Sequence, residues 1–181
     1  LCWRQKKGPR MDIKTIGVIG AGQMGNGIAH VKALADYTVL LNDISEDALE
    51  AALQTVSNNL ERQVGRGKIS AEERTSAIKR INATTKLTDL GQSDLVIEAA
   101  TERETVKQAI FEALVPHLKP DTILTSNTSS ISITRLTSRT DRPEKFMGFH
   151  FMNPVPIMQL VELIRGIATD EETFDACNTV V

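Results

Sequence analysis

Mostly apolar runs alternate along the chain with longer segments in which apolar and polar residues mix. The runs predict strands at 13–20, 37–43, 81–85, 94–100, 122–126, 145–151 and 157–164. Between them, apolar residues recur at helical spacing and predict helices over 22–35, 45–64, 70–80 and 101–118, and another helix begins near residue 169. Because most runs are apolar throughout, we expect an α/β fold with a mostly parallel sheet covered by helices on both faces.

Three Ser/Thr-x-x-Glu patterns mark predicted helix starts. They pair Ser70 with Glu73, Thr101 with Glu104, and Thr169 with Glu172. In such a capping box the hydroxyl and the glutamate each accept a hydrogen bond from a free backbone N–H of the first turn. The helices over 45–64 and 70–80 follow one another without a strand between them, so they predict a helical-hairpin insertion.

An uncharged polar stretch, Ser-Asn-Thr-Ser-Ser at 126–130, follows the apolar run 122–126. One interpretation is helix capping, in which Asn127 and Ser130 bind the start of the next helix. The other interpretation is a polar floor for a bound ligand. The stretch by itself leaves both open.

The composition excludes several classes of protein. Hydrophobic residues are 41% and charged residues 24% of the 181 positions, which is typical of a soluble globular protein. The formal net charge is -2 and there is no long basic stripe, so we expect no nucleic-acid partner. No apolar run approaches the roughly 20 residues of a membrane span, so we expect no membrane segment.

The two ends of the chain bear on its location and boundaries. Cys2 and Cys177 lie far apart and form no C-x-x-C motif, which indicates a reducing compartment, and we expect a cytoplasmic protein. Residues 1–10 are basic but lack the apolar core of a signal peptide. They are predicted to be an upstream extension or a cloning remnant, and residues 11–181 to form one domain.

Gly20, Gly22 and Gly25 form a G-x-G-x-x-G motif between the first predicted strand and its helix. Such a loop turns tightly, lets the backbone approach a pyrophosphate, and points a helix N-terminus at the phosphates. Gln23 and Met24 lie in the same loop, and we expect them beside the cofactor. In this context the motif predicts a Rossmann-like, doubly wound domain that binds a dinucleotide.

Asp43 ends the second predicted strand, just before Ser45. A carboxylate at this place accepts hydrogen bonds from the hydroxyls of the adenosine ribose and repels a 2′-phosphate, which predicts NAD rather than NADP. The alternative interpretation is an ordinary acidic residue at the N-terminus of the following helix.

His150 and Glu162 lie on two successive predicted strands and can face each other across the sheet. A carboxylate beside a histidine fixes the imidazole tautomer and makes it a stronger base. Glu162 also interrupts an apolar run, and a buried glutamate needs a partner. The alternative is a structural histidine and an edge-strand glutamate that faces water. No two histidines have the spacing of metal ligands, so we expect no metal.

Three segments together resemble the NAD-dependent L-3-hydroxyacyl-CoA dehydrogenases: GAGQMG (20–25), SNTSS (126–130) and HFMNPVPIMQLVELI (150–164). Within that family the sequence is most similar to the short-chain 3-hydroxybutyryl-CoA dehydrogenases, over about residues 12–181. The segment that begins at His150 is the most specific of the three. The resemblance implies an N-terminal NAD-binding domain of fatty acid metabolism (β-oxidation), which interconverts L-3-hydroxyacyl-CoA and 3-oxoacyl-CoA by hydride transfer.

The resemblance also implies roles for individual residues. His150 is the catalytic base, Glu162 is its partner, and Ser129 bridges the substrate and the nicotinamide. The implied cofactor contacts are Asn153 on the nicotinamide side, with Glu102 and Lys107 near the nicotinamide ribose. The alternatives for these last two are an ordinary acid at a helix start and a solvated lysine.

Arg62, Arg66 and Lys68 are candidates for contacts to the phosphates of coenzyme A. The alternative is a solvated basic helix end. Family members continue into a helical C-terminal domain that completes the acyl-CoA site and forms a homodimer, so we expect these 181 residues alone to bind NADH without turnover. Two competing hypotheses are a dehydrogenase of non-CoA β-hydroxyacids or sugar acids on the same domain, and an NAD-binding structural protein without catalysis.

Overall fold

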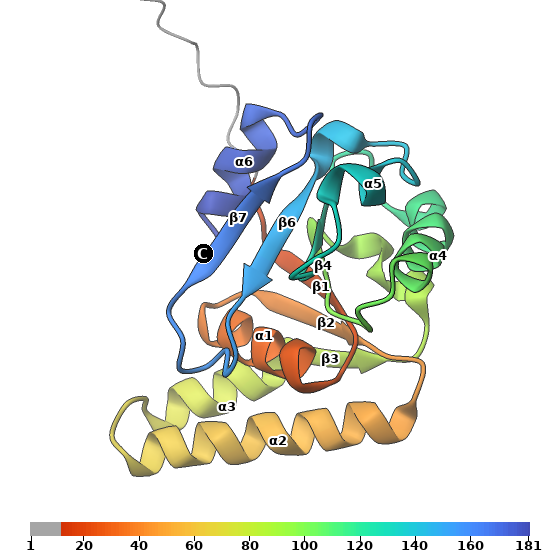
Figure 1. Cartoon of the computed structure of the whole chain (residues 1–181). Coiled ribbons are helices and arrows are strands. Elements are labelled where there is room, and N and C mark those ends of the chain that lie inside the picture. Colours follow the sequence, from red (N-terminus) through yellow and green to blue (C-terminus); the bar gives the residue numbers. More distant parts are fainter. Residues whose placement is uncertain (1–11) are drawn as a thin grey trace, which may run out of the picture.

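The computed structural model describes residues 12–181, and their strands form one seven-stranded sheet (Figure 1). The strands are β1 (Thr15–Ile19), β2 (Thr38–Asn42), β3 (Ile81–Thr84), β4 (Leu95–Glu98), β5 (Ile123–Ser126), β6 (Phe146–Phe151) and β7 (Val161–Arg165). Their order is β3-β2-β1-β4-β5-β6-β7, with every neighbouring pair parallel except β6 and β7. This confirms the predicted Rossmann-like, mostly parallel α/β fold. The prediction for residues 1–10 falls outside the described residues.

Helices cover both faces of this sheet (Figure 1). They are α1 (Gln23–Leu34), α2 (Glu46–Gly65), α3 (Ala71–Arg80), α4 (Glu104–Leu114), α5 (Ile133–Thr137) and α6 (Glu171–Asn178), with short 3-10 helices at Leu87–Gln92, Val115–His117 and Pro143–Lys145. No helix within residues 12–181 is long and apolar enough to cross a membrane.

Two hydrophobic cores form because successive side chains of a strand point to opposite faces. Along β4, Leu95 and Ile97 belong to the core beneath α1, α2 and α6, whereas Val96 belongs to the core beneath α4 and α5. All three side chains are fully buried. The apolar runs of the sequence therefore reflect a sheet that is buried on both faces.

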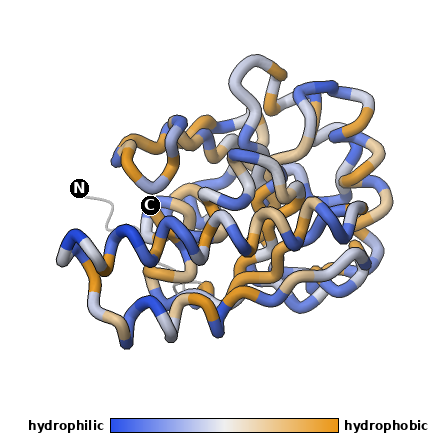
Figure 2. The backbone as a smooth tube through the Cα atoms, turned by 90° about the horizontal axis from the view of Figure 1, so that it is seen from below, coloured by the Kyte–Doolittle hydropathy of each residue, from blue (hydrophilic) through white to orange (hydrophobic). Residues whose placement is uncertain are grey.

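The predicted helical hairpin is α2 with α3, which lie below α1 in Figure 1. The buried side chains of α2 are Leu49, Ala52, Val56 and Leu60, one stripe at helical spacing, while the rest of the helix is largely polar (Figure 2). The predicted capping box of Ser70 and Glu73 at the start of α3 is confirmed, with both of its hydrogen bonds present.

The other two capping boxes were predicted wrongly. Arg103, not Thr101, is the N-cap of α4 and makes no side-chain cap, and Glu104 instead pairs with Arg135. At α6 the cap is Asp170, whose carboxylate accepts from the N–H of Thr173 at 2.7 Å. A Ser/Thr-x-x-Glu pattern cannot say which of several nearby polar residues takes the cap, because tertiary partners compete for the same side chains.

Two predicted boundaries also move. The strand predicted at 157–164 begins only at Val161, because residues 154–157 form a turn after β6. The helix predicted over 101–118 is α-helical only from Glu104 to Leu114 and continues as a 3-10 turn around Pro116. Proline at that position has no N–H to continue the α-helical pattern.

The strand order reverses between β1 and β4, because the chain runs from β1 outward to β2 and β3 and then returns to the other side of β1. At such a point the connections leave in opposite directions and open a crevice at the carboxyl ends of the strands, where α/β sheets bind ligands. Most of the predicted site residues follow or end β1, β2, β4, β5 and β6 at this edge.

Candidate active site

The glycine loop forms a cradle at the start of α1. Gly20 has a φ of 98°, which favours glycine, and a Cβ on Gly25 would lie 1.7 Å from the carbonyl oxygen of Gly20. A Cβ on Gly22 would meet nothing within 4 Å, so this position faces open space. Gly22 is also the N-cap of α1 and offers no side-chain acceptor to the amides of the first turn, which begins with Gln23 and Met24. These amides are the donors that a phosphate binds at a helix N-terminus.

Asp43 lies at the end of β2, and its carboxylate connects two elements of the crevice. Its Oδ2 accepts from the N–H of Ala21 at 2.8 Å, and its Oδ1 accepts from the N–H of Ser45 at 3.1 Å. Ser45 itself caps α2, because its hydroxyl accepts from the N–H of Ala48. Asp43 therefore does more than sit before a helix: it fixes the glycine loop against the end of β2.

His150 and Glu162 form a pair across the edge of the sheet. They are direct partners in the antiparallel register of β6 and β7, and His150 Nδ1 lies 2.8 Å from Glu162 Oε2. The Glu162 side chain is 52% exposed, so the expectation that burial forces it to pair was wrong. The register of the two strands brings the residues together, not desolvation.

The polar loop after β5 is organised around one carboxylate. Glu102 Oε1 accepts from Thr128 Oγ1 at 2.5 Å, from Ser130 Oγ and Ser129 N at 3.0 Å each, and from Ser130 N at 3.2 Å. Burial alone would raise the pKa of Glu102, but the hydrogen bonds from Thr128 and Ser130 and the charge of Lys107 lower it to about 2. Glu102 is therefore an anionic anchor for the loop that carries Ser129.

The capping interpretation of this loop was wrong for both residues. Ser132, not Asn127 or Ser130, caps α5 by accepting from the N–H of Arg135. Asn127 Oδ1 accepts instead from the N–H of Phe151 at 2.8 Å, which ties the loop to β6 directly beside His150.

Lys107 is buried, with a side chain only 1% exposed, so the solvated-lysine interpretation was wrong. Its Nζ lies 2.8 Å from both carboxylate oxygens of Glu98, the fully buried last residue of β4, and 3.6 Å from Glu102 Oε2. Glu98 was not among the residues predicted from the sequence. The available signal was a carboxylate at the end of an otherwise apolar strand.

Two hollows lie at this edge of the sheet. One of about 430 Å³ is lined by the glycine loop from Ala21 to Gln23, by Thr55 of α2 and by Asn153. Another of about 310 Å³ is lined by residues 128–134 and by Ile164 and Arg165 of β7. The first brings Asn153 next to the glycine loop, and the second has Ser129 in its wall.

Arg62, Arg66 and Lys68 do not line either hollow. They are exposed at the end of α2 and in the turn to α3. The structure therefore keeps these candidates for coenzyme A contacts apart from the crevice.

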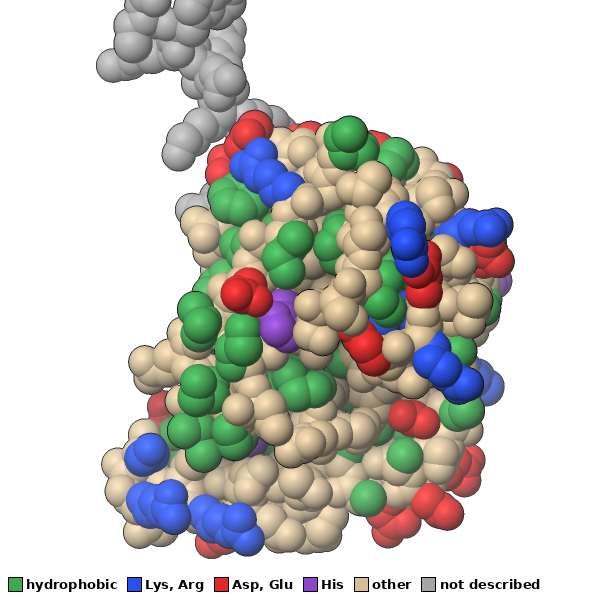
Figure 3. All heavy atoms as spheres, viewed as in Figure 1, with side chains coloured by type: hydrophobic (Ala, Val, Ile, Leu, Met, Phe, Trp, Pro, Cys, Tyr) green, Lys and Arg blue, Asp and Glu red, His purple; other side chains and the backbone are tan. Residues whose placement is uncertain are grey.

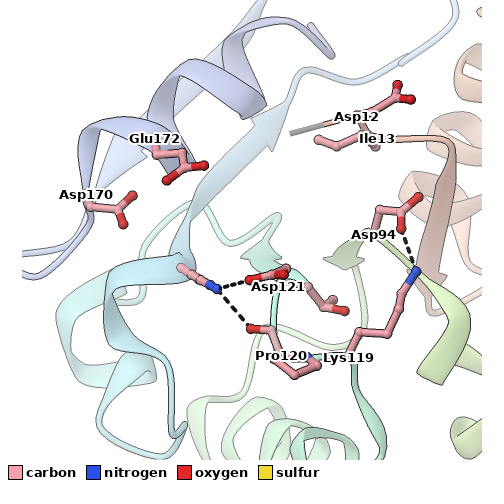
Figure 4. Close-up of a pocket in the computed structure, with 10 residues that line it drawn as sticks. Asp12, Ile13, Asp94, Lys119, Pro120, Asp121, Asp170 and Glu172 are labelled. Atoms are coloured by element: carbon pink, nitrogen blue, oxygen red, sulfur yellow. Dashed lines mark hydrogen bonds and ion pairs between the residues drawn. The ribbon is translucent and has the colours of Figure 1, made fainter. Parts of the chain in front are cut away.

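A larger hollow, of about 690 Å³, opens at the opposite, amino-terminal edge of the sheet (Figure 4). Five acidic residues line it, and its two lysines are already paired: Lys119 with Asp94 at 2.6 Å and Lys145 with Asp121 at 2.7 Å. An acidic surface whose lysines are already paired does not suit a cofactor with two negative phosphates. The larger hollow is therefore not the candidate cofactor site.

Within the described part of the chain, no three His, Cys, Asp or Glu residues are arranged to hold a metal ion. The expectation that the protein needs no metal stays a prediction.

A glycine cradle at a helix N-terminus, a carboxylate at the end of β2 and a crevice at the β1–β4 reversal define a dinucleotide-binding domain. The family described as "3-hydroxyacyl-CoA dehydrogenase, NAD binding domain" matches residues 15–181. The chain belongs to this family, and NAD is the cofactor that the family's domain binds.

Named relatives agree with this assignment. The chain is 59% identical over 169 residues to the 3-hydroxybutyryl-CoA dehydrogenase of Bradyrhizobium diazoefficiens, which covers 93% of this chain and 58% of that protein. The crystal structure of (S)-3-hydroxybutyryl-CoA dehydrogenase from Ralstonia eutropha matches with a TM-score of 0.91 and 43% identity, covering 93% of this chain and 60% of that one. A diketoreductase structure matches with a TM-score of 0.86 and 27% identity, over 93% and 60% of the two chains. The present chain thus spans less than two thirds of these relatives.

Proposed function

We propose that the protein interconverts L-3-hydroxyacyl-CoA and 3-oxoacyl-CoA, with the short-chain 3-hydroxybutyryl compound as its substrate. The observation that carries the proposal is the 2.8 Å contact between His150 and Glu162 at the carboxyl edge of the sheet. The loop with Ser129 is tied to the same strand through Asn127. An acid–base pair, a hydroxyl loop and a dinucleotide cradle at one edge are what the oxidation of a secondary alcohol requires.

In this proposal His150 moves the proton. Because Nδ1 faces the Glu162 carboxylate, Nδ1 carries the hydrogen and Nε2 keeps its lone pair. Nε2 takes the proton of the 3-hydroxyl in the oxidative direction and returns it to the 3-oxo oxygen in the reductive direction. Glu162 stabilises the positive charge on the imidazolium between these events. NAD, when bound, supplies the hydride chemistry at carbon 3.

The cradle supports NAD as the ligand of the described residues. Asp43 already accepts one hydrogen bond on each oxygen, and each oxygen has capacity for a second one from a ribose hydroxyl. Its negative charge opposes a 2′-phosphate, which favours NAD over NADP. Gly22 and the first-turn amides of Gln23 and Met24 would hold the pyrophosphate, while Glu102, Ser129 and Asn153 would face the nicotinamide half. Lys107 is buried and would support that half from behind Glu102.

The substrate side of the proposal draws on a hydrophobic surface beside the pair. Ile157, Met158 and Leu160 lie in the segment before β7 and are 73%, 44% and 54% exposed. Figure 3 shows hydrophobic side chains gathered on the face that carries β6 and β7. Such a surface is suited to an acyl chain and to a second, helical domain that covers it and completes a homodimer.

Arg62, Arg66 and Lys68 are proposed to meet the phosphates of coenzyme A. All three are exposed, and none forms an ion pair with any residue in the range 12–181. A location in the cytoplasm stays a prediction.

The similarity to a diketoreductase supports a second candidate, a reductase of small dicarbonyl compounds on the same domain. The test compares substrates in the full-length protein by following NADH oxidation. We expect a far higher kcat/KM with acetoacetyl-CoA than with acetoacetate or a diketo ester, because the coenzyme A part supplies binding energy to the transition state. Equal kcat/KM values would favour the second candidate, and no turnover with any of them would favour a non-catalytic NAD-binding protein.

A further inference from the structure

We propose that Glu98 is a positioning residue of the active site. Through Lys107 and Glu102 it sets the position of the loop that carries Ser129. The inference rests on the proposed function, in which Ser129 faces the substrate and the cofactor.

The Glu98 carboxylate is held from three directions. Glu98 is the last residue of β4 and lies between Ile19 of β1 and Ser126 of β5. Its Oε1 accepts from Lys107 Nζ and from the N–H of Ala100, both at 2.8 Å, and its Oε2 accepts from Lys107 Nζ at 2.8 Å and from Ser126 Oγ at 2.6 Å. With both oxygens shared in this way, the carboxylate has one orientation.

Glu98 in turn fixes Lys107. The lysine comes from α4 and reaches Glu98 with both side chains buried, 1% and 0% exposed. A buried ammonium group without a partner is strongly unfavourable, so the position of the Glu98 carboxylate determines the position of the Lys107 ammonium group. This places the ammonium 3.6 Å from Glu102 Oε2.

Glu102 connects Lys107 to the loop that carries Ser129. One of its oxygens faces Lys107, and the other accepts from Thr128, Ser129 and Ser130. The Glu102 side chain is itself 41% exposed, so burial contributes less to its position than its hydrogen bonds and ion pair do. Its orientation therefore depends on Lys107 on one side and on the loop on the other.

The location of the pair speaks against a purely structural role. Apolar residues of similar volume often stabilise a fold as well as a buried ion pair does. Here the pair lies at the β1–β4 reversal, beside the crevice where the negative phosphates bind. A lone carboxylate at that place would repel the phosphates, and Lys107 both cancels its charge and reaches Glu102.

The test uses the double variant Glu98→Gln/Lys107→Met, because each single change removes the close ion-pair partner of the other buried charge. Amide hydrogen exchange of Ser129 and Ser130 is measured in the 181-residue chain, and kcat is measured in the full-length protein at saturating NADH. We expect a thermal midpoint close to that of the unchanged protein, exchange at the two amides about tenfold faster, and a kcat lower by on the order of 10–10². The KM for acetoacetyl-CoA should change little.

The matched control is Glu104→Gln/Arg135→Met, which removes an ion pair between a half-buried residue of α4 and an exposed residue of α5 and leaves Glu102 unchanged. It should leave both loop exchange and kcat unchanged.

Unchanged exchange at Ser129 and Ser130 in a folded double variant would overturn the inference, and so would faster exchange with an unchanged kcat. If the double variant fails to fold, Glu102→Gln at an exposed side chain gives the same loop measurement, and unchanged exchange there overturns the inference equally. Failure of the proposed function looks different, since His150→Ala would then keep its turnover while the loop still depended on Glu98.

Discussion

His150 and Glu162 are direct register partners in the antiparallel pair of β6 and β7, with Nδ1 2.8 Å from Oε2. Register partners present their side chains on the same face of a sheet. The pair is therefore set by backbone hydrogen bonds between two strands, and not by a loop. Elements of the sheet hold a catalytic geometry more firmly than loops do.

Replacing the Glu162 carboxylate by an amide should impair turnover. In Glu162→Gln the side chain keeps its shape but cannot stabilise the imidazolium, so we expect kcat with acetoacetyl-CoA to fall by on the order of 10–10² in the full-length protein. Glu171→Gln is the control, because Glu171 pairs with Arg165 next to the same strand without contacting His150. A Glu162→Gln enzyme as fast as this control would contradict the role of the carboxylate.

The carboxylate at the end of β2 should decide between the two nicotinamide cofactors. We expect the unchanged chain to bind NADH much more tightly than NADPH in a fluorescence titration. Asp43→Ala should weaken NADH binding and narrow that difference, because the repulsion of a 2′-phosphate is gone. The variant also loses the bond to Ala21 N–H, so its thermal midpoint must be measured alongside. Equal affinities for the two cofactors in the unchanged chain would refute the argument.

Substitutions of two glycines of the loop should have different effects, one on stability and the other on NADH binding. A Cβ on Gly25 would collide with the Gly20 carbonyl at 1.7 Å, so Gly25→Ala should destabilise the fold itself. A Cβ on Gly22 meets no protein atom within 4 Å, so Gly22→Ala should keep its thermal midpoint and lose NADH affinity. Calorimetric scans with and without NADH measure both effects. A Gly22→Ala chain that binds NADH normally would mean that the pyrophosphate lies elsewhere.

The buried Lys32 should make the free energy of unfolding increase with pH in the alkaline range. Its side chain is 4% exposed, crosses the rings of Phe149 and Phe151, and donates to the carbonyl of Val180. Burial lowers the pKa of Lys32 to about 8, against a smaller, opposite effect of Cys177. The unfolded chain keeps the lysine proton up to its ordinary pKa of 10.5, so between pH 8 and 10.5 it binds more protons than the folded chain and stability rises with pH.

The measurement is the free energy of unfolding of the unchanged chain minus that of Lys32→Met, in urea, across this pH range. Subtraction removes most of the contribution of other groups, including Cys177, whose pKa burial raises to about 12. We expect the difference to move in favour of the unchanged chain by at most about 3 kcal/mol between pH 8 and 10.5. A difference that stays flat over that range would show that Lys32 titrates normally.

Sequence patterns could predict the fold because the features that determine it depend on residues close together in the sequence. The wholly apolar strands, the glycines at 20, 22 and 25 and the capping box at Ser70 depend on near neighbours and on periodicity. His150 and Glu162 face each other as expected because of the register of β6 and β7, although burial was the wrong reason, and their catalytic role stays a proposal.

What the sequence could not predict depends on partners far along the chain. The hydroxyls at 128–130 gather on Glu102, and Asn127 binds Phe151 N–H, so neither contact is visible in the polar stretch itself. Thr101 and Thr169 matched a capping pattern, but the N-cap residues are Arg103 and Asp170. Glu98 lies in an apolar run, and only the fold shows that Lys107 reaches it.

The most direct test of the proposed function is the turnover of His150→Ala in the full-length protein, with acetoacetyl-CoA and NADH. We expect kcat to fall by on the order of 10²–10⁴, the usual contribution of a positioned acid–base residue, while the Kd for NADH stays nearly unchanged. His117→Ala, on a 3-10 helix remote from the crevice, should behave like the unchanged protein. Near-normal turnover by His150→Ala would contradict the account.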